Sequence, residues 1–167
     1  YSNKSSFTIM KTIFFFIFLL IFLNVHSQDS LKIKQIDSIV LNINSSDLPV
    51  QKDTVILDQP QFGVKMTTDM SIIINDKNLL KYVQNVNGVI KENGNDRQMN
   101  TSSTFYYDNN KLIKVEEYLI EGDKKGDMNW YFSDDKLLYY TFESERSEER
   151  ANMLLTLSKT ILNQIFK

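Results

Sequence analysis

The sequence predicts an α+β domain made of an N-terminal helix, an antiparallel β-meander of five to six strands, and a C-terminal helix packed on the sheet. Three observations lead to this fold class. Apolar and polar side chains alternate along residues 64–75, turn signals recur through the chain that follows, and residues 143–166 carry apolar side chains at helical spacing.

The beginning of the chain has the features of an export signal. Met10 and Lys11 open a short basic region, and an almost unbroken apolar run follows from Thr12 to Leu23. A basic start, an apolar core and small residues at a cleavage point define a signal peptide. The run is shorter than the roughly 20 residues that a membrane span needs. We therefore expect a cleaved signal peptide, with an uncleaved anchor as the alternative.

The signal peptide sets the expected domain organisation. Residues 1–9 are interpreted as an upstream extension, 10–27 as the signal peptide with cleavage before Gln28, and 28–167 as a single α+β domain. The predicted location is periplasmic or secreted. The chain is rich in Lys, Asn and Ile, a bias that suits an AT-rich bacterial genome. No membrane span is expected once the leader is removed.

The charge of the mature domain is mild. Loss of Lys4 and Lys11 lowers the basic count from 19 to 17 against 21 acidic residues, a net charge of −4. Nucleic-acid binding requires a basic stripe, so no nucleic-acid partner is expected.

The residue types that carry most catalytic chemistry are missing. The chain has no cysteine, and its one histidine, His26, lies in the predicted leader. Nucleophilic sites built on Ser-His-Asp or Cys-His and ordinary zinc sites are thereby excluded. No catalytic residue, metal or cofactor is predicted, and the protein is expected not to be an enzyme.

Carboxylates leave one enzymatic alternative open. Glu116 and Glu117 are adjacent on a predicted strand, so their side chains point to opposite faces. Pairing of either with an acid on a neighbouring strand would allow a carboxylate-only hydrolase, which requires two acids converging in a cleft.

The first half of the domain contains a helix and two clear strands. Residues 30–44 carry Ile and Val at helical spacing, and Ser45 to Pro49 end the helix. A short strand is predicted over 53–57 and a longer one over 64–75, with a turn at 59–63 between them.

Residues 79–92 fit two patterns. Leu79, Val83, Val86 and Ile90 fall at helical spacing, whereas two asparagines and Gly88 disfavour a helix. Asn93-Gly94, a strong hairpin signal, follows directly. We interpret the segment as a strand, with a helix as the alternative.

The second half reads as hairpins followed by a helix. Strands are predicted near 99–107, 111–120, 127–133 and 136–142. The helix over 143–166 has one apolar face expected to cover the sheet: Ala151, Leu154, Leu155, Ser158, Ile161, Leu162 and Ile165.

A short repeat connects two of these hairpins. Tyr107 to Ile113 (YDNNKLI) aligns with Phe132 to Leu138 (FSDDKLL) at an offset of 25 residues. The pattern resembles the Tyr-x-x-x-Lys-Leu hairpins of small secreted bacterial envelope proteins and, faintly, MORN-type repeats. The resemblance implies a hairpin fold, and no functional residue is carried over from it.

Aromatic side chains crowd the last four strands and supply the candidate binding residues: Tyr106, Tyr118, Trp130, Tyr131 and Tyr140. An exposed tyrosine suits a binding surface because an apolar ring carries a polar tip. We expect Tyr106, Tyr131 and Tyr140 to point outward. The alternative is that the second of the two helices covers that face too and places them in the core.

These observations favour a non-enzymatic binding protein that engages a protein or envelope component through an aromatic sheet face. Two alternatives remain: the hydrolase described above, and a carrier that holds a small apolar ligand between the sheet and the C-terminal helix. The sequence leaves the oligomeric state open.

Overall fold

The computed structural model describes residues 29–92, 95–121, 124–141 and 147–167. The upstream extension over 1–9, the signal peptide over 10–27 and the cleavage point before Gln28 lie outside these ranges, as does the Asn93-Gly94 dipeptide. The chain forms two compact units, Tyr1–Gln35 and Ile36–Lys167. Residues 29–44 are helical, and the second unit contains the whole sheet.

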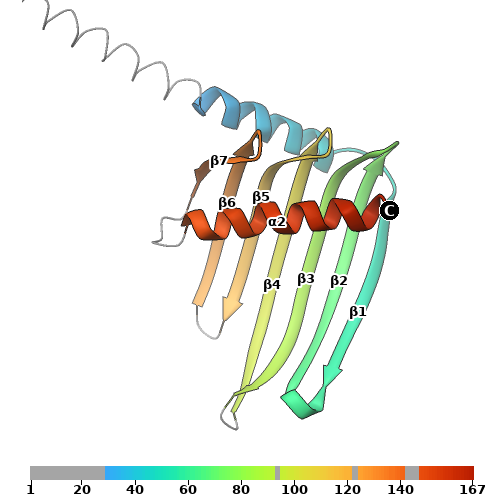
Figure 1. Cartoon of the computed structure of the whole chain (residues 1–167), viewed down its shortest axis with the longest axis vertical. Coiled ribbons are helices and arrows are strands. Elements are labelled where there is room, and N and C mark those ends of the chain that lie inside the picture. Colours follow the sequence, from blue (N-terminus) through green and yellow to red (C-terminus); the bar gives the residue numbers. More distant parts are fainter. Residues whose placement is uncertain (1–28, 93–94, 122–123, 142–146) are drawn as a thin grey trace, which may run out of the picture. The chain divides into compact units, whose positions relative to one another are not determined.

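The predicted α+β class with an antiparallel sheet and two helices is confirmed, and the number of strands is corrected to seven. The strands pair in sequence order (Figure 1): β1 (Val50–Gln59), β2 (Val64–Asn75), β3 (Asn78–Glu92), β4 (Asn95–Asp108), β5 (Lys111–Glu121), β6 (Lys124–Ser133) and β7 (Lys136–Tyr140). The strand predicted over 53–57 lies in β1, which is longer and has ten residues. β2 also pairs with the polar residues on both sides of the apolar centre of β1.

Residues 79–92 form a strand, as predicted, within β3. Gly88 fits because of a close approach to β2. A Cβ atom there would lie 2.6 Å from the Met66 Cγ and 2.9 Å from the Lys65 carbonyl oxygen. Glu92 pairs with Asn95 on either side of the predicted Asn-Gly turn.

Hairpins of one design recur at one end of the sheet. The β4–β5 turn has Asn109 and Asn110 at positive φ, and the β6–β7 turn has Asp134 and Asp135 there. Such left-handed conformations at both central residues are typical of tight hairpin turns. The register of each pair then shifts by one residue just beyond the turn, at Tyr106/Tyr107 and at Tyr131/Phe132.

The β2–β3 hairpin shares part of this design. Its register shifts between Ile73 and Ile74, but in its turn only Asp76 has a positive φ. The register shift of the 25-residue repeat therefore has a third counterpart with a different sequence.

One face of the sheet packs against α2 (Ser147–Ile165), which crosses the strands in Figure 1. The predicted apolar face of this helix is confirmed, since Ala151, Leu154 and Ile161 are buried in the core. The sheet contributes a cluster of buried side chains to this core: Leu79, Phe105, Tyr107, Leu112, Val115, Trp130 and Phe132.

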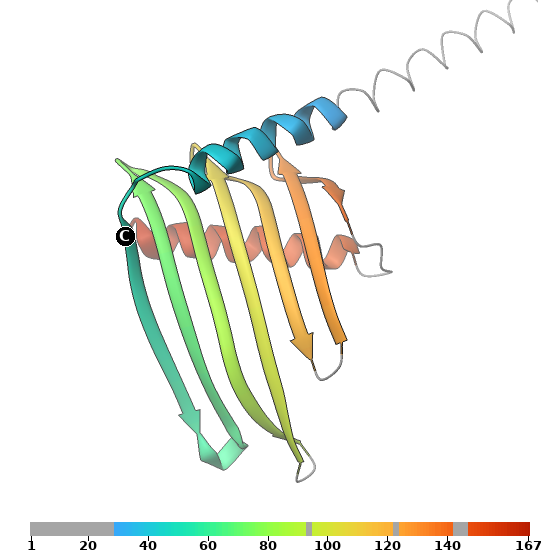
Figure 2. The ribbon, with the colours of Figure 1, turned by 180° about the vertical axis from the view of Figure 1, so that it is seen from behind.

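The other face contacts residues 36–44 at the hairpin end of the sheet, which is the end with the β2–β3, β4–β5 and β6–β7 turns (Figure 2). Ile36, Val40 and Ile43 are buried along this part of the helix. Both faces of the sheet are therefore covered at the hairpin end.

Candidate functional site

The candidate aromatic residues do not share one exposed face. Tyr106 and Tyr131 lie on the face that contacts residues 36–44, and both are buried. Trp130 is buried on the α2 face, where Tyr140 stacks on it with ring centroids 5.6 Å apart. Tyr118 alone of the five is exposed. The expectation that Tyr106, Tyr131 and Tyr140 point outward together is thus wrong.

The bulges explain this difference. Continued pairing from the two-residue β6–β7 turn would place Tyr140 on the same face as Tyr131. The register shift instead pairs Tyr131 with Tyr139 and Trp130 with Tyr140. Because side chains alternate between faces, a one-residue shift moves Tyr140 to the opposite side of the sheet.

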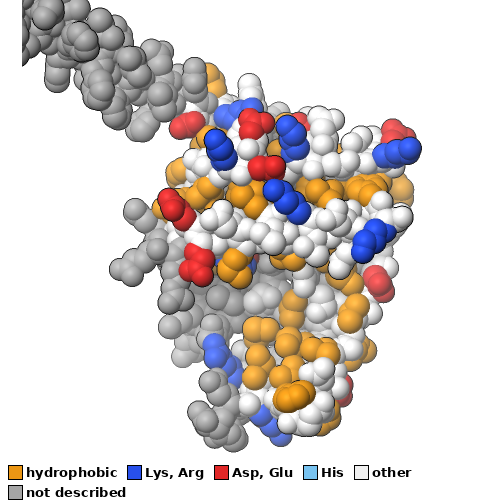
Figure 3. All heavy atoms as spheres, viewed as in Figure 1, with side chains coloured by type: hydrophobic (Ala, Val, Ile, Leu, Met, Phe, Trp, Pro, Cys, Tyr) orange, Lys and Arg blue, Asp and Glu red, His pale blue; other side chains and the backbone are white. Residues whose placement is uncertain are grey.

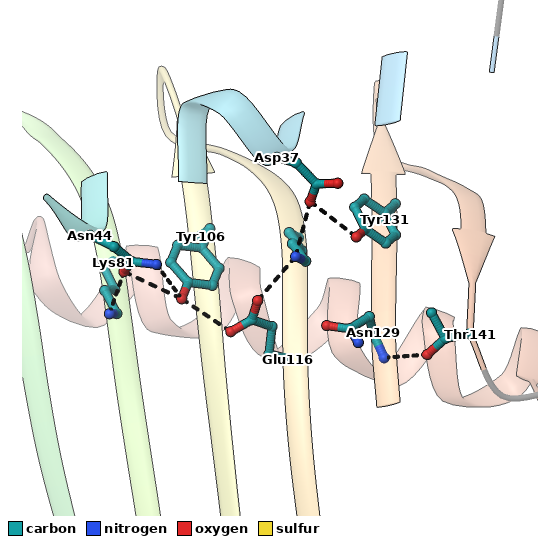
Figure 4. A network of polar contacts seen from close by, with 9 residues as sticks. Asp37, Asn44, Lys81, Tyr106, Glu116, Asn129, Tyr131 and Thr141 are labelled. Atoms are coloured by element: carbon teal, nitrogen blue, oxygen red, sulfur yellow. Dashed lines mark hydrogen bonds and ion pairs between the residues drawn. The ribbon is translucent and has the colours of Figure 1, made fainter. Parts of the chain in front are cut away.

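Tyr106 and Tyr131 belong to a polar network that fixes residues 36–44 to the sheet (Figure 4). Its centre is Lys114, whose side chain is only 9% exposed. The Lys114 ammonium lies 3.0 Å from Asp37 Oδ1 and 3.0 Å from Glu116 Oε1. The Tyr131 hydroxyl donates to the same Asp37 oxygen at 3.0 Å, and its ring lies below the ammonium.

The second half of the network joins the helix to β3 and β4. The Tyr106 hydroxyl donates to Glu116 at 3.1 Å and accepts from the Asn44 amide at 3.3 Å. Lys81 donates to the Asn44 carbonyl oxygen at 2.7 Å. Two helix residues seven positions apart, Asp37 and Asn44, therefore bind side chains from four strands.

Burial and partners shift the pKa values in this network. Burial opposes the charge of Lys114, but its contacts with Glu116, Asp37 and Tyr131 outweigh burial and raise the pKa above the ordinary lysine value. Burial raises the pKa of Tyr106 and of Tyr131. A lysine held charged in this way cannot serve as a general base near neutral pH, so the network is suited to docking the helix.

Sequence reasoning missed this network, although a signal was present. Asp37 and Asn44 lie on the helix beside the apolar stripe, and Lys114 and Glu116 share one face of their strand. Neither pattern identifies the residues that these side chains contact until the pairing register of the strands is known.

Glu117 lies on the α2 face, opposite Glu116, and is buried. It accepts from the Trp130 indole at 3.0 Å and from the Arg150 Nε at 3.2 Å, and a second Arg150 nitrogen also contacts it. This contact connects α2 to β5 and β6. The two adjacent glutamates thus support opposite layers of the fold.

Tyr118 borders a polar depression of about 430 Å³ that is also lined by Glu116 and Asp127. In the register of β5 and β6, Asp127 lies opposite Tyr118. Glu116, two positions before Tyr118, lies opposite Asn129. Glu116 already binds Lys114 and Tyr106. The depression therefore offers hydrogen-bonding groups to a polar molecule more readily than it offers a free pair of catalytic acids.

A pocket of about 310 Å³ lies between the C-terminal end of α2 and strands β1–β3. Its apolar lining is Met70, Ile72, Tyr82, Ile161 and Ile165. The pocket lies between the sheet and the C-terminal helix, the place that the carrier alternative assigns to a small apolar ligand.

An apolar strip continues from this pocket along the strands. It consists of Val55, Leu57, Met66, Val86 and Met99, which the strand register places on the α2 face. Figure 3 shows hydrophobic side chains gathered on this part of the surface, beyond the end covered by α2. Val55 and Leu57 are exposed, and the other three are half-buried.

The described ranges hold no group of three or more metal-binding side chains. None of the helices in these ranges has the length and apolarity that a membrane crossing requires. Comparison of the chain with protein-family models, curated proteins and solved structures gave no match.

Proposed function

We propose that this chain is an exported, non-enzymatic binding protein of the bacterial periplasm or cell exterior, which engages a protein or envelope component. The proposed binding surface is the apolar strip together with the pocket at the end of α2. This moves the binding surface away from the aromatic residues that the sequence favoured, because most of them are buried in the layers on either side of the sheet.

The observation that carries the proposal is the continuity of the pocket with the strip. Asp53 and Met70, which line the pocket, form a cross-strand pair. Val55, the first residue of the strip, follows two positions later on the same face of β1. A pocket that receives an anchoring side chain, bordered by apolar surface, is the arrangement typical of protein interfaces.

A second candidate function uses the pocket alone. A small apolar ligand would contact Ile72 and Tyr82 of the sheet and Ile161 of α2. The pocket volume of about 310 Å³ lies at the lower end of the range for small-molecule sites. The strip extends the apolar surface well beyond such a ligand, which favours the macromolecular partner.

The test compares capture of partners from an envelope extract by the tagged protein and by two variants. Met66→Asp places a charge in the apolar strip, and Thr67→Asp places the same charge on the opposite face of β2. We expect one stoichiometric component to be lost with Met66→Asp and retained with Thr67→Asp. Retention with both variants would overturn the proposed surface.

A second arm separates the two candidate functions. Ile165→Trp places a larger side chain in the pocket and reduces its free volume. Native mass spectrometry of the purified protein detects a bound small molecule. A small molecule that this variant loses, with no macromolecule captured by the wild type, would replace the proposal with the carrier.

A further inference from the structure

The two edges of the sheet differ in length and in exposure. β1 has ten residues, and Val50 to Asp58 are all exposed. β7, at the other edge, has five residues. In the described part of the chain, β2 is the sole strand paired with β1. A long edge strand with open backbone groups is a template for another strand.

The apolar centre of β1 makes this edge unusual for a solvated surface. Val55, Ile56 and Leu57 are consecutive and exposed, and the Ile56 side chain is 68% exposed. Edge strands of monomeric proteins are commonly protected by charges or prolines. Asp53 lies beside the apolar centre on the α2 face. On the opposite face one charge of each sign flanks the centre, Lys52 on one side and Asp58 on the other.

These two charges make the strand complementary to itself. If a second β1 pairs antiparallel with Val55 opposite Val55, Lys52 of each copy lies opposite Asp58 of the other. Gln51 then lies opposite Gln59, so nine of the ten residues find a partner. Because cross-strand partners share a face, the neighbouring antiparallel registers differ by two residues, and neither of them places Lys52 opposite Asp58.

We propose that two copies of this chain pair through β1 in the antiparallel register centred on Val55. The two seven-stranded sheets then form one continuous sheet around a two-fold axis. Cross-strand partners share a face, so both α2 helices lie on the same side. The proposal depends on the β1 edge and not on the partner that the apolar strip binds.

The second copy is favoured over an unrelated extended peptide by charge. A peptide would need a base followed six residues later by an acid, which is the order in β1 itself, and a second β1 supplies it by symmetry. Both ion pairs then form at once, on the face turned away from α2.

A single cysteine tests the register, because the full chain contains no cysteine of its own. Val55→Cys places the two thiols directly opposite each other across the axis, within reach of a disulfide. Gln51→Cys is the matched control, on the same strand and face and also exposed. We expect oxidation of the full-length protein to give a covalent dimer with Val55→Cys and a monomer with Gln51→Cys.

A charge exchange in the Val55→Cys background provides the second arm. Asp58→Lys puts like charges opposite each other and should lower the dimer yield at least fivefold. Adding Lys52→Asp restores opposite charges and should restore the yield. Circular dichroism of each variant reports whether the fold is retained. Equal yields from Val55→Cys and Gln51→Cys, or no rescue by the double exchange in folded protein, would overturn the proposal.

Discussion

Single residues in this protein have roles set by the sheet face to which they point. Tyr106 and Tyr107 are adjacent and both buried, yet their hydroxyls differ. Tyr106 binds Asn44 and Glu116, whereas the Tyr107 hydroxyl has no hydrogen-bond partner in the described part of the chain. Burial raises the pKa of Tyr107.

This contrast predicts opposite effects of one substitution. Tyr107→Phe removes a buried hydroxyl that makes no hydrogen bond, so the free energy of unfolding should stay the same or rise by up to about 1 kcal/mol. Tyr106→Phe removes two hydrogen bonds and should lower it by about 1–2 kcal/mol. Urea unfolding followed by the fluorescence of the single tryptophan, Trp130, measures both. A larger loss for Tyr107→Phe than for Tyr106→Phe would contradict this account.

At the scale of elements, each face of the sheet is held to its helix in a different way. α2 packs through a continuous apolar core, with the Glu117–Arg150 ion pair beside it. Residues 36–44 combine three buried aliphatic side chains with the network around Lys114. The attachment of this segment therefore depends more strongly on charge.

Lys114→Met should loosen that segment. It leaves Asp37 and Glu116 without their shared cation, and both carboxylates are about half-exposed. Loss of one partner of a buried ion pair costs 3–5 kcal/mol, and water softens this here, so we expect a loss of about 2 kcal/mol.

The matched control is Lys111→Met. Lys111 lies 3.6 Å from Asp134, and both side chains are mostly exposed. An exposed pair contributes little, so stability should change by less than about 0.5 kcal/mol. Hydrogen exchange of residues 36–44 should rise with Lys114→Met alone, and an equal rise in both variants would show that Lys114 has no special role.

For the whole molecule, the shifted groups predict sensitivity to alkali. The pKa values of Lys114, Tyr106, Tyr107 and Tyr131 are all raised in the folded protein, from ordinary values of 10.5 for lysine and 10.0 for tyrosine. The folded state therefore retains protons that the unfolded chain releases. Their contribution to stability is complete below about pH 10 and is lost as the pH rises further.

We expect the urea midpoint to fall between about pH 10 and pH 12, and to fall less steeply in Lys114→Met and in Tyr107→Phe. A midpoint that stays constant or rises over this range would contradict the assignment of these groups.

The sequence predicted much of the architecture and little of the site. The boundaries of β2 were predicted correctly because strict alternation of apolar and polar residues defines a half-buried strand. The apolar face of α2 followed from helical spacing in the same way. The fold class and the interpretation of residues 79–92 as a strand also agree with the structure.

The candidate site was predicted poorly because it depends on register. One bulge decides that Tyr140 and Tyr131 lie on opposite faces, and no local pattern in the sequence signals a bulge. The apolar strip combines residues from four strands, and each strand alone shows only ordinary alternation. Surfaces built from cross-strand neighbours become visible only once the strand pairing is known.

The central claim is that a partner binds the apolar strip, on the part of the α2 face that α2 leaves uncovered. The opposite face is covered by residues 36–44 at its hairpin end. The most direct measurement is photo-crosslinking in intact cells from a diazirine amino acid placed at Met66 or at Thr67, which lie on opposite faces of β2. The account predicts one specific adduct from position 66 and none from position 67. An adduct from position 67 alone, or the same adduct from both, would contradict it.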